Sequence, residues 1–238
     1  LILGWSRKVP KVLAELLGHQ RESLKIDVVA MTPIEEREIP IDSVVCAQRA
    51  GTIRQVQANF MDPDVVAEIH PESRGSVLLV ARARMDDEAT ADAATVSAFL
   101  TIDTLMSGEK GPHIVAEVLE EENEVLFDSD HCEAIVSPMI VSYILSQVAL
   151  KPELGLIFQE LTQLQGPTIL FRSPEPVTGE ASSSFSDLAT QAAARGETAI
   201  GVVTSGAGGR QTRLNPGADS RWTCEEIEQV IVLGTVSR

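Results

Sequence analysis

The sequence is poor in aromatic side chains, which make up only 4% of its 238 residues. Its hydrophobic core therefore has to be built from Val, Ile, Leu and Ala, the residues that fill buried parallel strands. Hydrophobic residues reach 44% and charged residues 23%, an ordinary balance for a globular chain. A chain of this length forms one large domain, or one domain with a smaller one beside it.

Basic residues are also scarce, with 19 Lys and Arg against 35 Asp and Glu and a formal net charge of −16. Nucleic-acid-binding proteins neutralise phosphates with Lys and Arg, so no nucleic-acid partner is expected. The three cysteines, Cys46, Cys132 and Cys224, are far apart and odd in number. They predict neither a disulfide framework nor a zinc site, and they are typical of a reducing compartment.

Long apolar runs are missing as well, since none approaches the roughly 18 residues of a membrane-spanning helix. No signal peptide opens the chain. Residues 1–3 are apolar and have the pattern of a core strand, with no Met before them. A natural chain rarely begins inside a core strand, so we expect this sequence to be a fragment of a longer protein.

Apolar segments of strand length and helix length alternate through the first half of the chain. Residues 1–3 predict a strand, residues 9–17 a helix and residues 25–31 a second strand, which together make a βαβ unit. The third strand is predicted at residues 53–58, with residues 44–47 as the alternative. The pattern continues with short helices after Thr32 and Asp62, strands at 76–81, 113–119 and 134–136, a long helix at 88–105 and an acidic helical turn at 120–124. This alternation predicts an α/β fold with a Rossmann-like, doubly wound parallel sheet.

The pattern changes after residue 137. Residues 139–150 and 153–164 predict two helices that only Lys151 and Pro152 separate. Beyond them we expect a small α+β subdomain, with strands at 168–172, 199–204 and 230–233, a helix at 185–195 and a glycine-rich hairpin tip at 205–209. The chain is therefore divided into a Rossmann-like lobe at 1–137, a helix pair at 138–165 and a C-terminal subdomain at 166–238.

The turn after the first predicted strand is where a dinucleotide-binding fold carries three glycines, and here only Gly4 is present. Such folds also end the second strand with an acidic residue that binds the ribose, whereas residues 30–32 are Ala, Met and Thr. Ordinary NAD binding is therefore not expected. The following helix still offers free N–H groups beside Arg7 and Lys8, so an anionic nucleotide is a candidate ligand.

A ligand of a parallel sheet lies where the carboxyl ends of the strands meet. The candidate ligand-binding residues are the first turn and the residues after the third and fourth strands: Gly4, Trp5, Ser6, Arg7, Asn59 and Arg82.

No combination of residues predicts catalysis. Ser6 lacks the second glycine of a nucleophile elbow, the four histidines lack metal-ligand spacing, and no P-loop pattern occurs. We do not expect an enzyme, and a nucleotide-dependent Rossmann-fold enzyme such as an oxidoreductase is the alternative. A hard cation such as Ca²⁺ is a second candidate ligand, bound by an acidic surface that comprises Asp86, Asp87, Glu88, Asp92 and Glu117, with Glu120, Glu121 and Glu122 nearby. The alternative for the first group is a set of carboxylates that favour the start of a helix.

The predicted helix pair is more apolar than one surface stripe requires, and no charged residue occurs from 139 to 150. A second surface must cover it, either within the chain or in a partner. We expect a twofold homodimer, the commonest oligomer, with burial between the sheet domain and the C-terminal subdomain as the alternative. The expected interface residues are Met139, Ile140, Tyr143, Ile144, Leu154, Ile157, Phe158 and Leu161.

Taken in order, several motifs resemble one family. The opening LILGWS at 1–6 is similar to the start of the regulator-of-K⁺-conductance (RCK, TrkA-N/TrkA-C-like) domain of CASTOR/POLLUX-type ion channels, in which LGWS replaces the glycine fingerprint. Later segments of the sequence also resemble this domain: HIVAEV at 113–118 with NEVL at 123–126, IVS at 135–137, KPEL at 151–154, LNP at 214–216 and VIVL at 230–233. Two positions depart from the family: Asn59 stands where many relatives carry an Asp that contacts adenine, and Ile227-Glu228 replaces a Gly-Asp pair.

The resemblance implies a cytoplasmic, ligand-sensing gating-ring module of a membrane protein, a K⁺ or other cation channel, that couples ligand binding to pore opening. It also implies that the helix pair is a helix–turn–helix crossover, that the chains assemble as dimers within a ring, and that a transmembrane pore precedes residue 1. A soluble regulatory subunit of a K⁺ transporter is the alternative.

Overall fold

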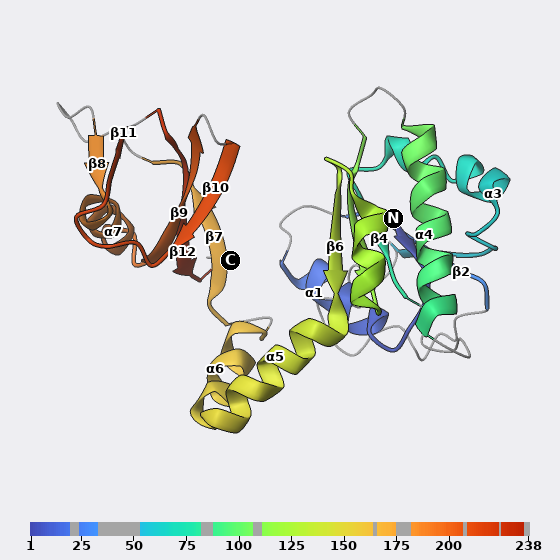
Figure 1. Cartoon of the computed structure of the whole chain (residues 1–238), viewed down its shortest axis with the longest axis horizontal. Coiled ribbons are helices and arrows are strands. Elements are labelled where there is room, and N and C mark those ends of the chain that lie inside the picture. Colours follow the sequence, from blue (N-terminus) through green and yellow to red (C-terminus); the bar gives the residue numbers. More distant parts are fainter. Residues whose placement is uncertain are drawn as a thin grey trace. The chain divides into compact units, whose positions relative to one another are not determined.

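The computed structural model describes residues 1–19, 24–32, 53–81, 88–106, 111–163, 166–174, 182–206, 209–223 and 225–235. The chain divides into two compact units, Leu1–Pro152 and Glu153–Arg238, and each is described by itself (Figure 1). Within the described residues, no helix combines the length and the apolar character needed to cross a membrane.

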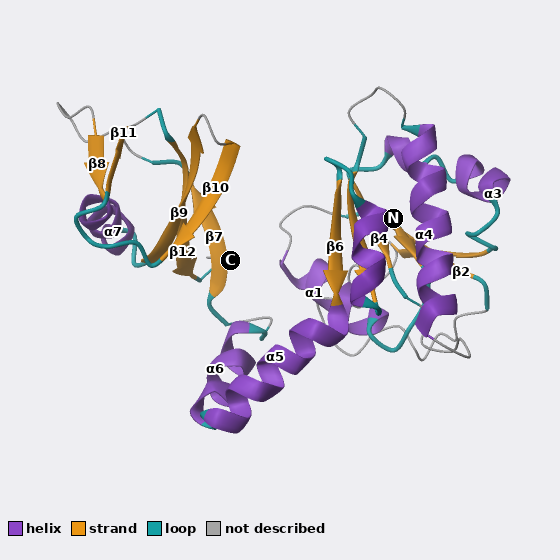
Figure 2. Cartoon of the chain, in the orientation of Figure 1, coloured by secondary structure: helices purple, strands orange, loops and turns teal. Residues whose placement is uncertain are grey.

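The first unit is built on a six-stranded, wholly parallel sheet in the order β3-β2-β1-β4-β5-β6. Figure 2 draws strands in orange and helices in purple. Its strands are β1 (Ile2–Leu3), β2 (Ile26–Ala30), β3 (Ile53–Gln57), β4 (Ser76–Leu79), β5 (His113–Val118) and β6 (Cys132–Val136). This is the order of a doubly wound dinucleotide-type sheet, so the predicted Rossmann-like fold is confirmed. The third strand lies at the predicted place, and the alternative at 44–47 lies outside the described residues.

Among the described residues, the helices of this unit are α1 (Val9–His19), α3 (Pro63–Glu68), α4 (Glu88–Leu105) and α5 (Ser137–Leu150), with the short 3₁₀ helices η3 (Pro71–Ser73) and η4 (Glu121–Phe127). The predicted α4 has the observed bounds, whereas α1 continues through Gly18 rather than ending before it. Asp62 begins α3 as predicted, because its carboxylate accepts a hydrogen bond from the Asp64 amide at 3.1 Å. The helix predicted after Thr32 lies outside the described residues.

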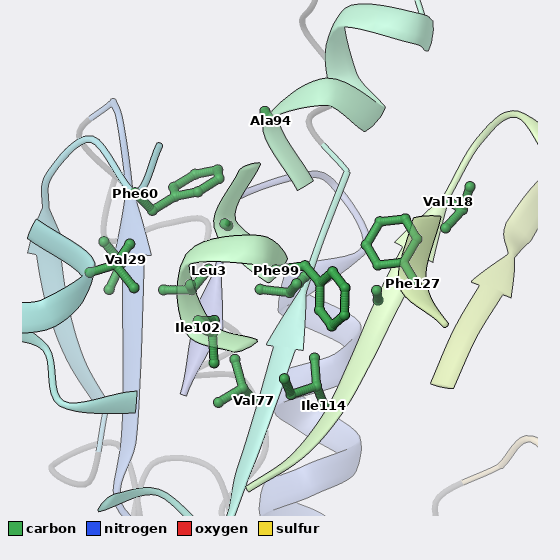
Figure 3. Packing of buried hydrophobic residues seen from close by; sticks show 14 of the residues in the cluster. Leu3, Val29, Phe60, Val77, Ala94, Phe99, Ile102, Ile114, Val118 and Phe127 are labelled. Atoms are coloured by element: carbon green, nitrogen blue, oxygen red, sulfur yellow. The ribbon is translucent and has the colours of Figure 1, made fainter. Parts of the chain in front are cut away.

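Neighbouring residues of one strand pack into different cores, because successive side chains of a strand point to opposite faces. Leu3 and Val29 pack with α4, whose Phe99 ring lies 5.1 Å from the Phe127 ring of η4 (Figure 3). Ile2 and Val28 pack instead against a cluster that α1 supplies with Val9, Leu13 and Leu17. Both faces of the sheet are therefore covered, as a parallel sheet requires.

The second unit is an α+β subdomain, as predicted. Its main sheet is antiparallel in the order β10-β9-β12-β7, a second sheet pairs β11 with β8, and α7 packs on the main sheet through Leu188 and Ala192. The elements are α6 (Glu153–Leu161), β7 (Thr168–Arg172), β8 (Ser182–Ser184), α7 (Phe185–Ala194), β9 (Thr198–Gly206), β10 (Gly209–Leu214), β11 (Arg221–Thr223) and β12 (Ile227–Gly234). The glycine-rich tip joins β9 and β10 as a hairpin. The sequence did not predict β8, β10 or β11, and α6 ends before the predicted residue 164.

Candidate functional site

The candidate site is the carboxyl edge of the parallel sheet, where β1 and β4 lie side by side. The strand order changes direction between these two strands, and α1 and α4, the helices that come after them, pack into the two different cores. Doubly wound sheets bind their ligands in the crevice that forms at this switch point. Gly4 to Lys8 follow β1, and Val80 and Ala81 follow β4.

Gly4 makes the close turn at the end of β1. Its amide donates to the Val29 carbonyl at 2.9 Å, its φ is +105°, and a Cβ there would lie only 2.3 Å from the Val80 carbonyl oxygen. A side chain would therefore both clash and strain the backbone. Dinucleotide-binding folds carry three glycines in this turn. Gly4, the one present here, is required by the packing of β1 against β4.

Ser6 is buried at the entry to α1. Its hydroxyl accepts a hydrogen bond from the Lys8 amide at 3.4 Å, and its carbonyl accepts one from Val9 at 3.1 Å. Trp5 is half-buried and packs against the cluster beneath α1. Ser6 thus occupies one of the amides that a bound anion would use, and Trp5 holds the turn on the core.

Arg7 and Lys8 are exposed at the amino end of α1. The Lys8 ammonium forms an ion pair with Glu117 near the end of β5 and donates to the Ser137 hydroxyl at 3.3 Å. Arg7 has no hydrogen-bond or ion-pair partner among the residues that the structure describes. This edge of the sheet therefore carries one cation that is already engaged and one, Arg7, that has no partner among the described residues.

Asn59 lies at the same edge of the sheet, after β3, which is two strands away from β1. Its Oδ1 accepts a hydrogen bond from the Met61 amide at 3.2 Å, and its carbonyl accepts one from Asp62 at 3.0 Å. The side-chain oxygen is thus used within the turn that leads into α3. Arg82, the remaining candidate, lies outside the described residues.

Asp92, predicted as a cation ligand, is 1% exposed and accepts three hydrogen bonds. Its Oδ1 binds the Leu119 amide, and its Oδ2 binds the Glu120 amide and the Asn123 side-chain amide, each at 2.9 Å. Asp92 therefore holds the loop between β5 and η4. The short-range sequence pattern gave no sign of this role, because the partners are 27 to 31 residues away.

The other predicted cation ligands divide into two sets. Glu117 is paired with Lys8, whereas Asp86 and Asp87 lie outside the described residues, as does the side chain of Glu88. Within the described part of the chain, no group of three or more His, Cys, Asp or Glu side chains is placed to hold a metal ion.

A second charged cluster, which sequence reasoning missed, lies at the opposite, amino edge of the sheet. Asp27 of β2 accepts hydrogen bonds from Arg54 Nε at 3.0 Å and Arg54 Nη2 at 2.7 Å, and Arg74 Nη2 lies 2.8 Å away. Burial opposes ionisation of Asp27, but the two guanidinium groups together hold its pKa below the ordinary value. The sequence signal for this cluster was Asp27, an acidic residue inside the apolar run of β2.

Among the described residues, neither α5 nor α6 has a buried residue, so the predicted interface residues are at least partly exposed. Met139, Ile140, Tyr143, Ile157 and Leu161 are exposed. Ile144, Leu154 and Phe158 are half-buried.

No family model matches this chain, and no curated protein sequence matches it. Among solved structures, the human SLO3 gating ring is similar with a TM-score of 0.63 and 15% identity, over 97% of this chain and 43% of that one. The GsuK channel bound to NAD gives a TM-score of 0.43 and 14% identity, over 98% of this chain and 36% of that one. The chain thus spans less than half the length of either structure, and the likeness to the gating ring shows a shared fold.

Proposed function

We propose that this chain is an RCK-type regulatory module of CASTOR/POLLUX kind, which senses a ligand within the gating ring of a K⁺ or other cation channel. The observation that carries the proposal is the shared fold with a gating ring, which extends over both units of the chain. The LGWS turn and the order of the later motifs support the same family. The proposed module is not an enzyme, and its pore belongs to a part of the protein outside this sequence.

The ligand site of the proposed module is the crevice at the carboxyl ends of β1 and β4, beside Arg7. The amides of Val9, Lys11 and Val12 are hydrogen-bonded within the turn. The anionic end of a nucleotide fits this place through the charge of Arg7 and Lys8, which precede α1 at the positive end of its dipole. An ordinary NAD site is not proposed, since β2 ends at Ala30 and is followed by Met31 and Thr32, none of them acidic. Ca²⁺ is the second proposed ligand class, for Asp86 and Asp87, which lie outside the described residues, because Asp92 and Glu117 are engaged by other groups.

Transmission from this crevice needs a contact that differs between the free and bound states, because a ligand shifts an equilibrium only by binding one state more tightly. The ion pair of Lys8 and Glu117, with the bond to Ser137, supplies such a contact. Ser137 is the first residue of α5. An anion that draws Lys8 towards itself weakens the hold on Glu117 and Ser137, and so alters the start of the helix that leads to the second unit.

Calorimetric titration with ATP, ADP, NAD⁺ and CaCl₂ tests the ligand site. For an anionic ligand, Arg7→Ala should weaken binding by about 1–3 kcal/mol, the range for a lost charged hydrogen bond. Lys11→Ala, which removes the same charge one turn further along α1, should change affinity little. Unchanged affinity in Arg7→Ala would move the site elsewhere, and tight stoichiometric NAD⁺ binding would contradict the exclusion of an ordinary NAD site.

Assembly of the proposed module uses the uncovered faces of α5 and α6 in a homodimer within the ring. Charge placed there should prevent burial, so Ile157→Glu should shift the protein from dimer towards monomer in analytical sedimentation. Leu214→Glu introduces the same charge at an exposed apolar residue of β10 and should leave the dimer intact. A wild-type chain that stays monomeric at high micromolar concentration would refute this mode of assembly.

A further inference from the structure

Asp92 carries a buried carboxylate that the proposed transmission through Lys8 does not use. It lies in the second turn of α4 and is 1% exposed. No Lys or Arg in the described part of the chain pairs with it, and three N–H donors hold it instead, from Leu119, Glu120 and Asn123. A carboxylate away from water is costly unless such donors stay in place, so the two backbone amides are fixed to α4.

The part of β5 that these amides follow has lost its neighbour on one side. The ladder between β4 and β5 ends at the pair of Leu79 and Ala116. The ladder with β6 continues through Glu117 to Val118. Beyond Ala116, the β4 side of this strand therefore needs another partner for its backbone groups.

Asp92 is that partner. The His113 amide at the start of β5 donates to the carbonyl of Gly75, just before β4, and backbone groups along a strand alternate between its two neighbours. Leu119, also odd-numbered, therefore directs its amide to the β4 side. Asp92 Oδ1 accepts that amide at 2.9 Å, and Oδ2 accepts the Glu120 amide at the same distance. The helix after β4 thus does what β4 itself no longer does at the end of β5.

Glu117 lies two residues before Leu119 on the strand that Asp92 fixes. Val118 packs in the core beneath α4, so the side chain of Glu117 points to the other face of the sheet. There it forms the ion pair with Lys8, which also donates to Ser137 at the start of α5. A displaced end of β5 would carry Glu117 away from Lys8 and change this contact.

We propose that Asp92 is a positioning residue for the contact of Lys8 with Glu117 and Ser137. It fixes the end of β5 to α4 and so sets how firmly the start of α5 is held. The proposal rests on the proposed function, in which Lys8 transmits ligand binding to α5, but its test uses the protein without ligand. A nucleotide titration that failed would therefore leave this result unchanged. A sequence of contacts does not by itself establish coupling, so the coupling has to be measured.

Hydrogen exchange of Asp92→Asn measures the effect on α5. The substitution removes one acceptor oxygen, so the Glu120 amide loses its partner. Residues 137–145, the first turns of α5, should exchange about threefold faster, the size expected for the loss of an exposed ion pair. Asp103→Asn, on the same helix, removes an exposed carboxylate that bonds Ser129 and should leave these residues unchanged. Wild-type exchange of α5 in Asp92→Asn would overturn the proposal.

A double variant distinguishes positioning from a loss of stability. If Asp92 acts through Glu117, Asp92→Asn combined with Glu117→Gln should speed exchange at 137–145 no more than one of the two changes does. Effects that multiply would show a separate route and overturn the proposal. β2, which is buried throughout, reports global unfolding. Faster exchange in β2 with none in α5 would leave Asp92 only a structural role.

Asn123→Ala is the milder variant, for use if Asp92→Asn does not fold. It removes one of the three hydrogen bonds and leaves both backbone amides on Asp92. Exchange should rise in η4 and stay as in the wild type at 137–145. Faster exchange of α5 in Asn123→Ala would assign the hold on α5 to η4 and overturn the role of the end of β5.

Discussion

The two edges of the parallel sheet each hold a shielded carboxylate, but they hold it in different ways. The Asp27 side chain at the amino edge is 10% exposed and the Glu117 side chain at the carboxyl edge is 12% exposed. Asp27 is bound by the fork of Arg54 and by Arg74, whereas Glu117 is bound by the single flexible ammonium of Lys8. Planar guanidinium forks fix a carboxylate from two directions, which one ammonium does not do. The carboxylate at the amino edge is thus fixed more firmly than the one at the carboxyl edge, where the proposed anionic ligand would rearrange Lys8.

The two edges of the sheet differ in how their side chains are held. The backbone at the carboxyl edge, by contrast, should be rigid. Gly4→Ala should lower the free energy of unfolding by about 4 kcal/mol, because it adds backbone strain to a close contact with Val80. Gly75→Ala is the matched control, since a Cβ there meets no atom within 4 Å. Urea denaturation of both variants measures the difference. Equal stability of the two would show that the turn at Gly4 adapts and that the carboxyl edge is soft throughout.

The next largest effect is expected at the amino edge. Asp27→Asn should destabilise the protein by about 2 kcal/mol, because it leaves the largely buried guanidinium of Arg74 without its carboxylate, whereas Arg54 is mostly exposed. Asp130→Asn, at an exposed loop residue, should change stability by less than about 0.5 kcal/mol. If urea denaturation gives the same value for both variants, the cluster at the amino edge contributes nothing to stability.

The difference in the free energy of unfolding between wild type and Asp27→Asn should depend on pH, because the pKa of Asp27 is lowered in the folded protein. A carboxylate whose pKa is lower in the folded protein stabilises it above the unfolded pKa of about 3.9, and this stabilisation is lost as the pH falls through the folded value. The difference in the free energy of unfolding between wild type and Asp27→Asn should therefore be constant above about pH 5 and should become smaller below about pH 4. If this difference became larger as the pH fell, the pKa of Asp27 would not be lowered in the folded protein.

The smallest effect is expected from Glu117→Gln at the carboxyl edge. Its partner Lys8 is largely exposed, and pairs of this kind contribute about 1 kcal/mol or less. The same urea titration checks this value. A loss as large as that of Asp27→Asn would show that both edges are equally fixed, and the contrast between them would disappear.

Local patterns predicted most of the fold because its elements bury continuous apolar runs. The continuous apolar runs at β2 and β4, and the apolar residues of α4, were sufficient to place these elements. β10 was missed because its six residues, GRQTRL, are all exposed and show no apolar alternation. Its pairing with β9 depends on backbone hydrogen bonds, which leave no mark in the residue types.

The candidate site was less predictable, because its key contacts join residues far apart in sequence. Lys8 and Glu117 are 109 residues apart, and Asp27 and Arg54 are 27 apart. Asp92 lies in an acidic cluster and therefore resembled a cation ligand, but its partners are backbone amides supplied by a distant loop. Residue types indicate which groups carry charge, and only the folded chain determines which of them meet.

Hydrogen exchange tests the central claim most directly, that a ligand at the carboxyl edge acts on α5 through Lys8. The protein is measured free and saturated with whichever of ATP, ADP and NAD⁺ raises its melting temperature most, since a specific ligand stabilises the folded state by mass action. The account predicts slower exchange at residues 4–8 together with altered exchange in the first turn of α5, residues 137–141, and loss of the second change in Glu117→Gln. Protection confined to other residues, or an α5 that exchanges identically with and without ligand, would contradict it.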